Sequence, residues 1–277
     1  MYLKHFGLKE LPFRITPDTS FVFANRYHQE ALNTVLVALQ EGEGFIKITG
    51  EVGTGKTLLC RRLLQSLGED WVTAYLPNPS LAPEALSLAI AEELGIRETA
   101  SLDHYQLVRR INRELLHLAR ARKRVAVLVD EAQAMPVPTL EALRLLSNLE
   151  TEKRKLLHIV LFGQPELDER LRQPEIRQLA QRVAFHCRLR GVQKRELQSY
   201  VAHRLRVAGY VGEGLFTPSA LRALYRGSDG APRLINILAH KSMLLAFGEG
   251  KQMVGLRHVR LACKDTEGVR RLRWFWW

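Results

Sequence analysis

Cysteines and long apolar segments are scarce in this sequence. The three cysteines, Cys60, Cys187 and Cys263, are an odd number at unrelated spacings. This excludes a disulfide framework and a cysteine metal site, and reduced thiols in the cytosol are expected. No window approaches the roughly 20 apolar residues that span a bilayer, and the N-terminus lacks the apolar core of a signal peptide. We therefore expect a cytoplasmic protein that is soluble or peripheral to a membrane.

Internal repeats and low-complexity tracts are also missing, which excludes fibrous and disordered classes. The chain has 277 residues, 46% of them hydrophobic, so it can bury a full core. Acidic residues are also few, with 29 Asp and Glu against 41 Lys and Arg, so the net charge is +12. Residues 193–277 hold 15 Lys and Arg against 6 Asp and Glu, a net charge of +9. Such a region either meets an anionic partner, nucleic acid or acidic lipid, or is a solvated basic surface.

One run of the sequence fits a phosphate-binding loop of the Walker A type. It reads Gly50-Glu51-Val52-Gly53-Thr54-Gly55-Lys56-Thr57 and matches G-x-x-x-x-G-K-[ST] at every fixed position. Apolar patterns predict a strand before it and a helix after it, from Leu58 on. In such a loop backbone N–H groups converge on the phosphates of ATP or ADP, Lys56 adds a positive charge, and Thr57 can ligate Mg²⁺. The run from Gly50 to Leu58 therefore predicts an ATP-binding site.

A second apolar run, residues 125–129, ends in Asp130 and Glu131. Continuous apolar residues are typical of a strand that is buried on both faces of a parallel sheet, and acids at its carboxyl end face the nucleotide. We expect Asp130 to position Mg²⁺ and Glu131 to orient or deprotonate the attacking water, as in a Walker B motif. Capping of the next helix is the alternative interpretation.

Five apolar segments are expected to form strands. They lie at 45–49, 71–76, 125–129, 157–162 and 183–189. Because helical patterns alternate with them, we predict a parallel sheet flanked by helices on both faces. Beyond Gly191 only helical patterns occur, at 193–208, 217–226, 232–247 and 255–264. The predicted fold is an N-terminal strap plus α/β nucleotide-binding domain, residues 1–192, followed by a small all-helical lid domain, residues 193–277.

The phosphate loop, the acidic pair and the helical lid together resemble the AAA+ ATPases. The resemblance implies that Gln164, after the fourth strand, is the first sensor, although many members have Asn or Thr there. It implies an arginine that reaches a neighbouring subunit's γ-phosphate, which is Arg182 in Ala180-Gln181-Arg182-Val183, with Arg177 as the competitor. Gly230-Ala231-Pro232-Arg233 looks like the second-sensor motif, with Arg233 aimed at the phosphates. The alternative for each is an ordinary turn or surface residue.

A closer resemblance includes the N-terminal strap, with Phe6-Gly7-Leu8, Pro12-Phe13 and Thr16-Pro17-Asp18, and the later runs Val129-Asp130-Glu131-Ala132-Gln133 and Phe162-Gly163-Gln164-Pro165. Together these are similar to the general secretion pathway protein A (ExeA) and MSHA pilus biogenesis (MshM) group of AAA+ ATPases. The resemblance implies Mg²⁺-dependent ATP hydrolysis that drives conformational work in assembly of a type IV (MSHA-like) pilus or related type II secretion machinery. It also implies a homo-oligomeric ring or filament and pilus or secretion assembly proteins as partners at the inner membrane.

The end of the sequence bears on which branch of that group is nearer. Secretion-type members continue into a transmembrane helix and a periplasmic region, whereas this sequence ends in the basic and aromatic run 270–277. If Trp277 is the natural C-terminus, the MshM-like reading is favoured; if not, the secretion reading gains. The tail's arginines and aromatic rings suit contact with anionic lipid. Burial of the rings against the lid is the alternative.

Two other functions remain open at this stage. Transposition ATPases and replication initiators share the AAA+ plan, and the lid is basic, so an ATP-dependent DNA-binding regulator is the main alternative. A scaffold that binds ATP but barely hydrolyses it is the other.

Overall fold

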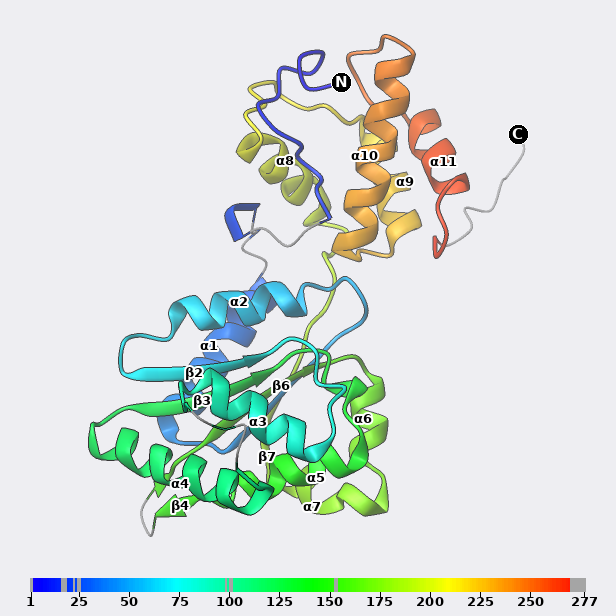
Figure 1. The fold of residues 1–277 in the computed structure, drawn as a ribbon. Coiled ribbons are helices and arrows are strands. Elements are labelled where there is room, and N and C mark those ends of the chain that lie inside the picture. The colour runs from blue at the N-terminus through cyan, green and yellow to red at the C-terminus, as the bar shows by residue number, and fades with distance from the viewer. Residues whose placement is uncertain are drawn as a thin grey trace. The chain divides into compact units, whose positions relative to one another are not determined.

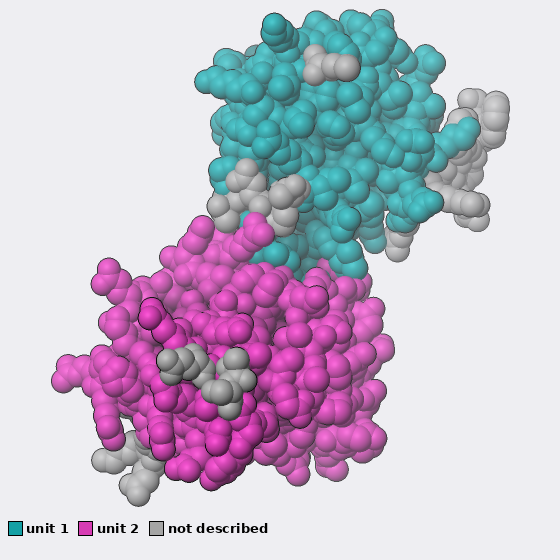
Figure 2. Space-filling model, in the orientation of Figure 1, with its two compact units in different colours: residues 1–25, 52–58, 190–277 teal, residues 26–51, 59–189 magenta. Residues whose placement is uncertain are grey.

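The computed structural model describes residues 2–269 apart from 16–18, 22, 24–25, 98, 100–101 and 152–153. The chain forms two compact units, which Figure 2 shows in different colours. Residues 26–51 and 59–189 make up one, called the α/β unit here. Residues 1–25, 52–58 and 190–277 make up the other, called the helical unit. The aromatic tail at 270–277, for which lipid contact was expected, lies outside the described residues.

The α/β unit is built on a parallel sheet of five strands in the order β2-β3-β6-β1-β7 (Figure 1). The strands are β1 (Phe45–Thr49), β2 (Trp71–Leu76), β3 (Arg124–Val129), β6 (His158–Gly163) and β7 (Val183–Arg188). Every residue of β6 is buried, as expected of a central strand covered on both faces. The predicted parallel five-stranded sheet is confirmed.

Helices cover both faces of this sheet. They are α1 (Arg26–Glu41), α2 (Lys56–Ser66), α3 (Pro83–Glu93), α4 (His104–Arg120), α5 (Val137–Leu146), α6 (Glu166–Leu171) and α7 (Arg177–Arg182), with 3₁₀ turns η2 (Ala132–Ala134) and η3 (Pro174–Ile176). The buried side chains of α1 and α2 form one cluster with Ile46 and Ile48 of β1. Those of α3 to α7 form another with Phe45. Alternate residues of one strand therefore serve two separate cores.

One element of the α/β unit was not predicted. It is the short antiparallel hairpin of β4 (Glu150–Thr151) and β5 (Arg154–Lys155). Each strand has only two residues, too few for the apolar alternation that signals a strand in a sequence.

The helical unit contains η1 (Thr19–Phe21), α8 (Leu197–Val207), α9 (Pro218–Ser228), α10 (Pro232–Gly248) and α11 (Leu256–Lys264). Proline stands in the first turn of α9 and α10, where its missing N–H costs nothing. The Thr217 side chain also caps α9 by accepting the backbone N–H of Ala220. All four predicted helices of this region are present, and α8 begins four residues later than its pattern indicated.

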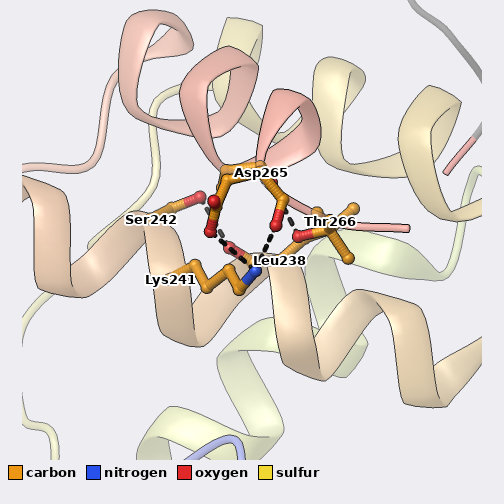
Figure 3. Close-up of polar contacts among 6 residues, drawn as sticks. Leu238, Lys241, Ser242, Asp265 and Thr266 are labelled. Atoms are coloured by element: carbon orange, nitrogen blue, oxygen red, sulfur yellow. Dashed lines mark hydrogen bonds and ion pairs between the residues drawn. The ribbon is translucent and has the colours of Figure 1, made fainter.

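Lys241 of α10 joins that helix to the end of α11 (Figure 3). Its Nζ lies 2.6 Å from the Asp265 backbone oxygen and 2.8 Å from Asp265 Oδ2. A cation at this place satisfies a terminal carbonyl and meets the negative end of the helix dipole. Around it, Ser242 and Thr266 bond back to the carbonyls of Leu238 and Ala262.

The N-terminal strap packs within the helical unit. Arg204 of α8 is buried, donates from Nε to the Pro12 carbonyl at 2.6 Å, and lies over the Phe21 ring at 4.9 Å. Tyr2 donates to or accepts from His240 Nδ1 at 2.7 Å, and burial raises the pKa of Tyr2 to about 12. The expected division, which grouped the strap with residues up to 192, differs from this packing. The reason is that the strap's aromatic rings are buried among helices that lie some 200 residues away in the chain.

Within the described part of the chain, no helix combines the length and the apolar composition that crossing a membrane requires.

Candidate functional site

The predicted phosphate loop joins β1 to α2 at the carboxyl edge of the sheet. Gly50 is buried, and its N–H donates to the Gly163 carbonyl at 3.1 Å, which extends the pairing of β1 with β6 one residue past the strand. The loop then runs to Lys56, where α2 begins. A strand, a loop and a helix therefore follow one another as the phosphate-binding pattern requires.

The backbone of this loop has the conformation that its glycines permit. Gly53 and Gly55 have φ of 77° and 94°, in the left-handed region that other residues rarely adopt. Thr54 and Lys56 are buried, with 3% and 5% of their surface exposed. A buried lysine beside a loop of this shape fits a site for an anionic ligand.

Within the helical unit, the loop lies directly against the start of α10. The Arg233 N–H points to the Gly53 carbonyl at 3.4 Å, and a Cβ added to Gly53 would come within 2.6 Å of Arg233 Cβ. The Arg233 side chain is exposed. Gly53 is therefore required for two reasons, its positive φ and this close approach. Sequence reasoning had placed Arg233 at the phosphates without identifying this contact.

Asp130 follows β3 and is buried, with 3% of its surface exposed. Tyr75 of β2 donates to it, and burial together with the Asp130 charge raises the pKa of Tyr75 to about 12. Burial, followed by the same charge, also raises the pKa of the Cys60 thiol in α2. Because Cys60 lies one turn after Thr57 in α2, this carboxylate faces the part of the helix that follows the phosphate loop.

Glu131 adopts an unusual backbone conformation. Its φ is 53°, left-handed, and its N–H donates to Asp130 Oδ1 at 3.0 Å. A non-glycine residue in this region costs of order 1–3 kcal/mol, and such strain clusters at functional sites. Here it turns the chain sharply at the end of β3, so that the side chains of the two consecutive acids meet different partners.

The Glu131 carboxylate is held by two glutamines. Gln133 Nε2 donates to Glu131 Oε2, and Gln164 Nε2 donates to the same oxygen at 3.1 Å. Gln133 Oε1 in turn accepts the backbone N–H of Gln164 at 3.0 Å. The ends of β3 and β6 are thus joined through side chains. The structure brings Asp130, Glu131 and Gln164 to one edge, as the motifs predicted, and adds Gln133, whose position two residues after Glu131 was the signal that sequence reasoning missed.

Replacement of Gln133 by Ala is expected to lower the turnover of ATP hydrolysis about 10-fold, with little change in KM. The reason is positional: the substitution frees Glu131 on one side and removes the acceptor that holds the Gln164 backbone. Steady-state kinetics across ATP concentrations check it.

The matched control for this prediction is Gln106→Ala. Gln106 also accepts a backbone N–H through its side chain, from Asp103, but at the start of α4. Equal turnover in the two variants would show that Gln133 is not a positioning residue.

An ion pair connects α6 to β1. Lys47 Nζ lies 2.5 Å from Asp168 Oδ1, and His186 Nε2 of β7 lies 2.9 Å from Thr49 Oγ1. Burial and the Lys47 charge lower the pKa of His186. Since Lys47 precedes the phosphate loop and Asp168 follows Gln164, this pair joins the two segments that carry the predicted site. A lysine inside an apolar strand was its only sequence signal.

The two candidate trans arginines lie at opposite ends of α7. Arg182 is half-buried and donates from Nη1 to Ser147 Oγ at 2.9 Å, at the end of α5. Arg177 is exposed, and among the described residues it takes part in no ion pair. Their roles stay predictions, but their surroundings differ: Arg182 already has a partner in its own chain.

The donor set fits a nucleotide with Mg²⁺. The loop has the positive-φ glycines and the buried lysine that phosphates need. Thr57 and Asp130 offer hydroxyl and carboxylate oxygens, which Mg²⁺ prefers. When bound, Mg²⁺ would neutralise part of the negative charge of the phosphates.

Comparison with known sequences gives two results. A family model described as an AAA domain matches residues 39–171. General secretion pathway protein A of Aeromonas hydrophila is 43% identical over 270 residues, which are 98% of this chain and 49% of that protein. The chain thus spans about half the length of the curated relative it matches.

Comparison with solved structures gives likeness at the level of the fold. The ORC2 protein of Aeropyrum pernix, solved as ADPNP-ADP complexes, has a TM-score of 0.65 with 16% identity, over 91% of this chain and 72% of that chain. Cdc6p of Pyrobaculum aerophilum has a TM-score of 0.67 with 18% identity, over 90% and 70%. These values confirm the predicted fold class.

Proposed function

We propose that this chain, an AAA+ protein related to general secretion pathway protein A, hydrolyses ATP to drive conformational work in the assembly of secretion or type IV (MSHA-like) pilus machinery. The relative's name supports the secretion part, and the AAA domain supports the ATPase part. The pilus assignment rests on the resemblance of the strap and motifs alone. The likeness to ORC2 and Cdc6p concerns the fold, so the alternative of a DNA-binding regulator gains no support from it.

The chemistry follows from the residues at the sheet edge. Lys56 and the loop N–H groups would bind the phosphates, and Thr57 and Asp130 would hold Mg²⁺. Glu131 would orient a water and take its proton, while Gln164 would keep the carboxylate and the water in line. Arg233, at the start of α10 beside Gly53, would contact the same phosphates from the helical unit.

One observation carries this proposal: a single Glu131 carboxylate oxygen accepts from both Gln133 and Gln164. Two side-chain donors on one oxygen fix the orientation of the carboxylate, which a general base needs in order to meet the attacking water. An acid that only capped the next helix would bond to backbone N–H groups, and no side-chain cap is seen on η2.

The test is ATP hydrolysis measured across a range of protein concentrations, with Lys56→Ala as the inactive reference. We expect a specific activity that rises with concentration, since an arginine supplied by a neighbouring subunit acts only in the assembly. Lys56→Ala removes the charge on the phosphates and should abolish the activity. Negligible turnover of the unaltered protein at every concentration would contradict the ATPase proposal, and constant specific activity would contradict the trans arginine.

A further inference from the structure

Positive charge is concentrated on α4 and the loop that follows it. Residues 104–124 contain seven Lys and Arg and one acidic residue, Glu114, for a net charge of +6. This is half of the charge of the whole chain, and it lies in the α/β unit rather than in the basic helical region that the composition emphasised.

The arginines of α4 form a stripe along its solvent side. Leu107, Ile111 and Leu115 are buried and turn one side of the helix toward the core. Arg109, Arg113 and Arg120 follow one another at helical spacings of four and seven residues, on the opposite side. All three are exposed, and from Arg109 to Arg120 the helix rises about 16 Å. In Figure 1, α4 runs along the outside of the α/β unit.

The charge of this stripe is not compensated within the unit. Among the described residues, Arg110, Arg113, Arg120 and Arg122 take part in no ion pair, and Glu114 pairs with His117 at 3.6 Å. Two neighbouring cations have structural roles. Lys123 of the loop and Arg124 at the start of β3 donate to backbone carbonyls at 2.7 and 3.2 Å. Repulsion among uncompensated arginines falls when an anionic surface approaches.

A groove of about 1340 Å³ lies beside the end of α4. Its charged lining consists of Arg120, Arg122, Lys123, Arg124, Lys155, Glu41 and Glu150. Arg109 and Arg113 lie outside this lining. A partner that entered the groove would therefore reach only one end of the stripe, whereas a flat anionic surface meets the stripe along its length.

An aromatic side chain marks the other end of the stripe. Tyr105 is 68% exposed, and the Arg109 guanidinium lies 5.7 Å from the centroid of its ring. A tyrosine beside cations is typical of protein surfaces at the level of lipid head groups.

We propose that the α4 stripe of Arg109, Arg113 and Arg120, extended by the exposed neighbours Arg110 and Arg122, is a docking surface for an anionic lipid bilayer. Each cation near such a surface contributes to the attraction, and the contributions fall steeply with salt. This proposal rests on the proposed function in one respect, which is that the protein works at a membrane. Binding itself needs no hydrolysis.

The experiment is cosedimentation of the full chain with vesicles of phosphatidylglycerol mixed with phosphatidylcholine, without nucleotide. The variant R110Q/R113Q/R120Q/R122Q removes four charges of the stripe. The matched control R206Q/R222Q/R226Q/R260Q removes four exposed arginines of the helical unit. We expect the stripe variant to bind at least about 10-fold more weakly and the control to bind nearly as the unaltered chain does.

Three results would overturn the proposal. They are equal loss in both variants, equal binding to pure phosphatidylcholine vesicles, and a stripe that is needed for binding duplex DNA but not vesicles. Circular dichroism and the ATPase rate without vesicles accompany each measurement. A stripe variant that fails to fold is replaced by the single changes R113Q and R120Q. Loss of vesicle binding at an unchanged ATPase rate separates this surface from the proposed function.

Discussion

Glu131→Gln is expected to lower kcat for ATP hydrolysis about 100-fold or more while ATP binding is retained. The substituted amide keeps the shape of the side chain but cannot take a proton from water. Gln133 and Gln164 both donate to Oε2 of Glu131. The new amide presents to these two donors either its NH₂ group, which cannot accept their hydrogens, or its single oxygen. Turnover at saturating ATP and the affinity for a fluorescent ATP analogue measure the two effects separately.

The matched control is Glu166→Gln, an exposed acid in the first turn of α6. It removes the same charge from the same unit without touching the glutamine pair. If Glu131→Gln hydrolysed ATP as fast as this control, Glu131 would not be the base. The chain would then be an ATP-binding scaffold or would use another acid.

Arg177→Ala is expected to lower kcat about 1000-fold in the assembled protein. An arginine that stabilises the charge on a phosphoryl group bound by a neighbouring subunit must be able to extend its side chain toward that subunit. Arg177 is exposed at the start of α7, whereas Arg182 bonds to Ser147 within its own unit. The resemblance favours Arg182, with Arg177 as the competitor. These surroundings reverse that preference, and we expect Arg177 to act in trans and Arg182 to hold α7 against α5.

Mixing separates a trans arginine from a structural one. Arg177→Ala and Lys56→Ala, each inactive alone, should regain part of the activity when combined, because a mixed interface pairs an intact phosphate loop with an intact arginine. Arg172→Ala, an exposed arginine five residues earlier, is the control and should keep full activity. Recovery with Arg182→Ala in place of Arg177→Ala would reverse the assignment, and recovery with neither would contradict an arginine in trans.

The sequence by itself determined the sheet, the phosphate loop and the acidic pair. Each depends on residues that are close in the chain: a run of apolar residues makes a buried strand, and glycines at fixed spacing make a loop whose N–H groups converge. The order of strands and helices then permits few topologies, and the carboxyl edge of β3 had to meet the loop after β1. For the same reason Asp130 and Glu131 could be identified by their place after a strand, whereas Gln164 was identified through the resemblance to the AAA+ ATPases.

Only the tertiary structure decided which distant residues meet. Gln133 is linked to Gln164, Lys47 to Asp168, and Gly53 to Arg233, across separations that no local pattern encodes. The strap's aromatic rings are buried in the helical unit, although the strap's sequence shows no periodicity from which its partner helices could be identified. The basic stripe of α4 became visible when the buried side of the helix was known. Periodicity predicts that a face is buried, but the partner of that face is selected by packing complementarity over the whole fold.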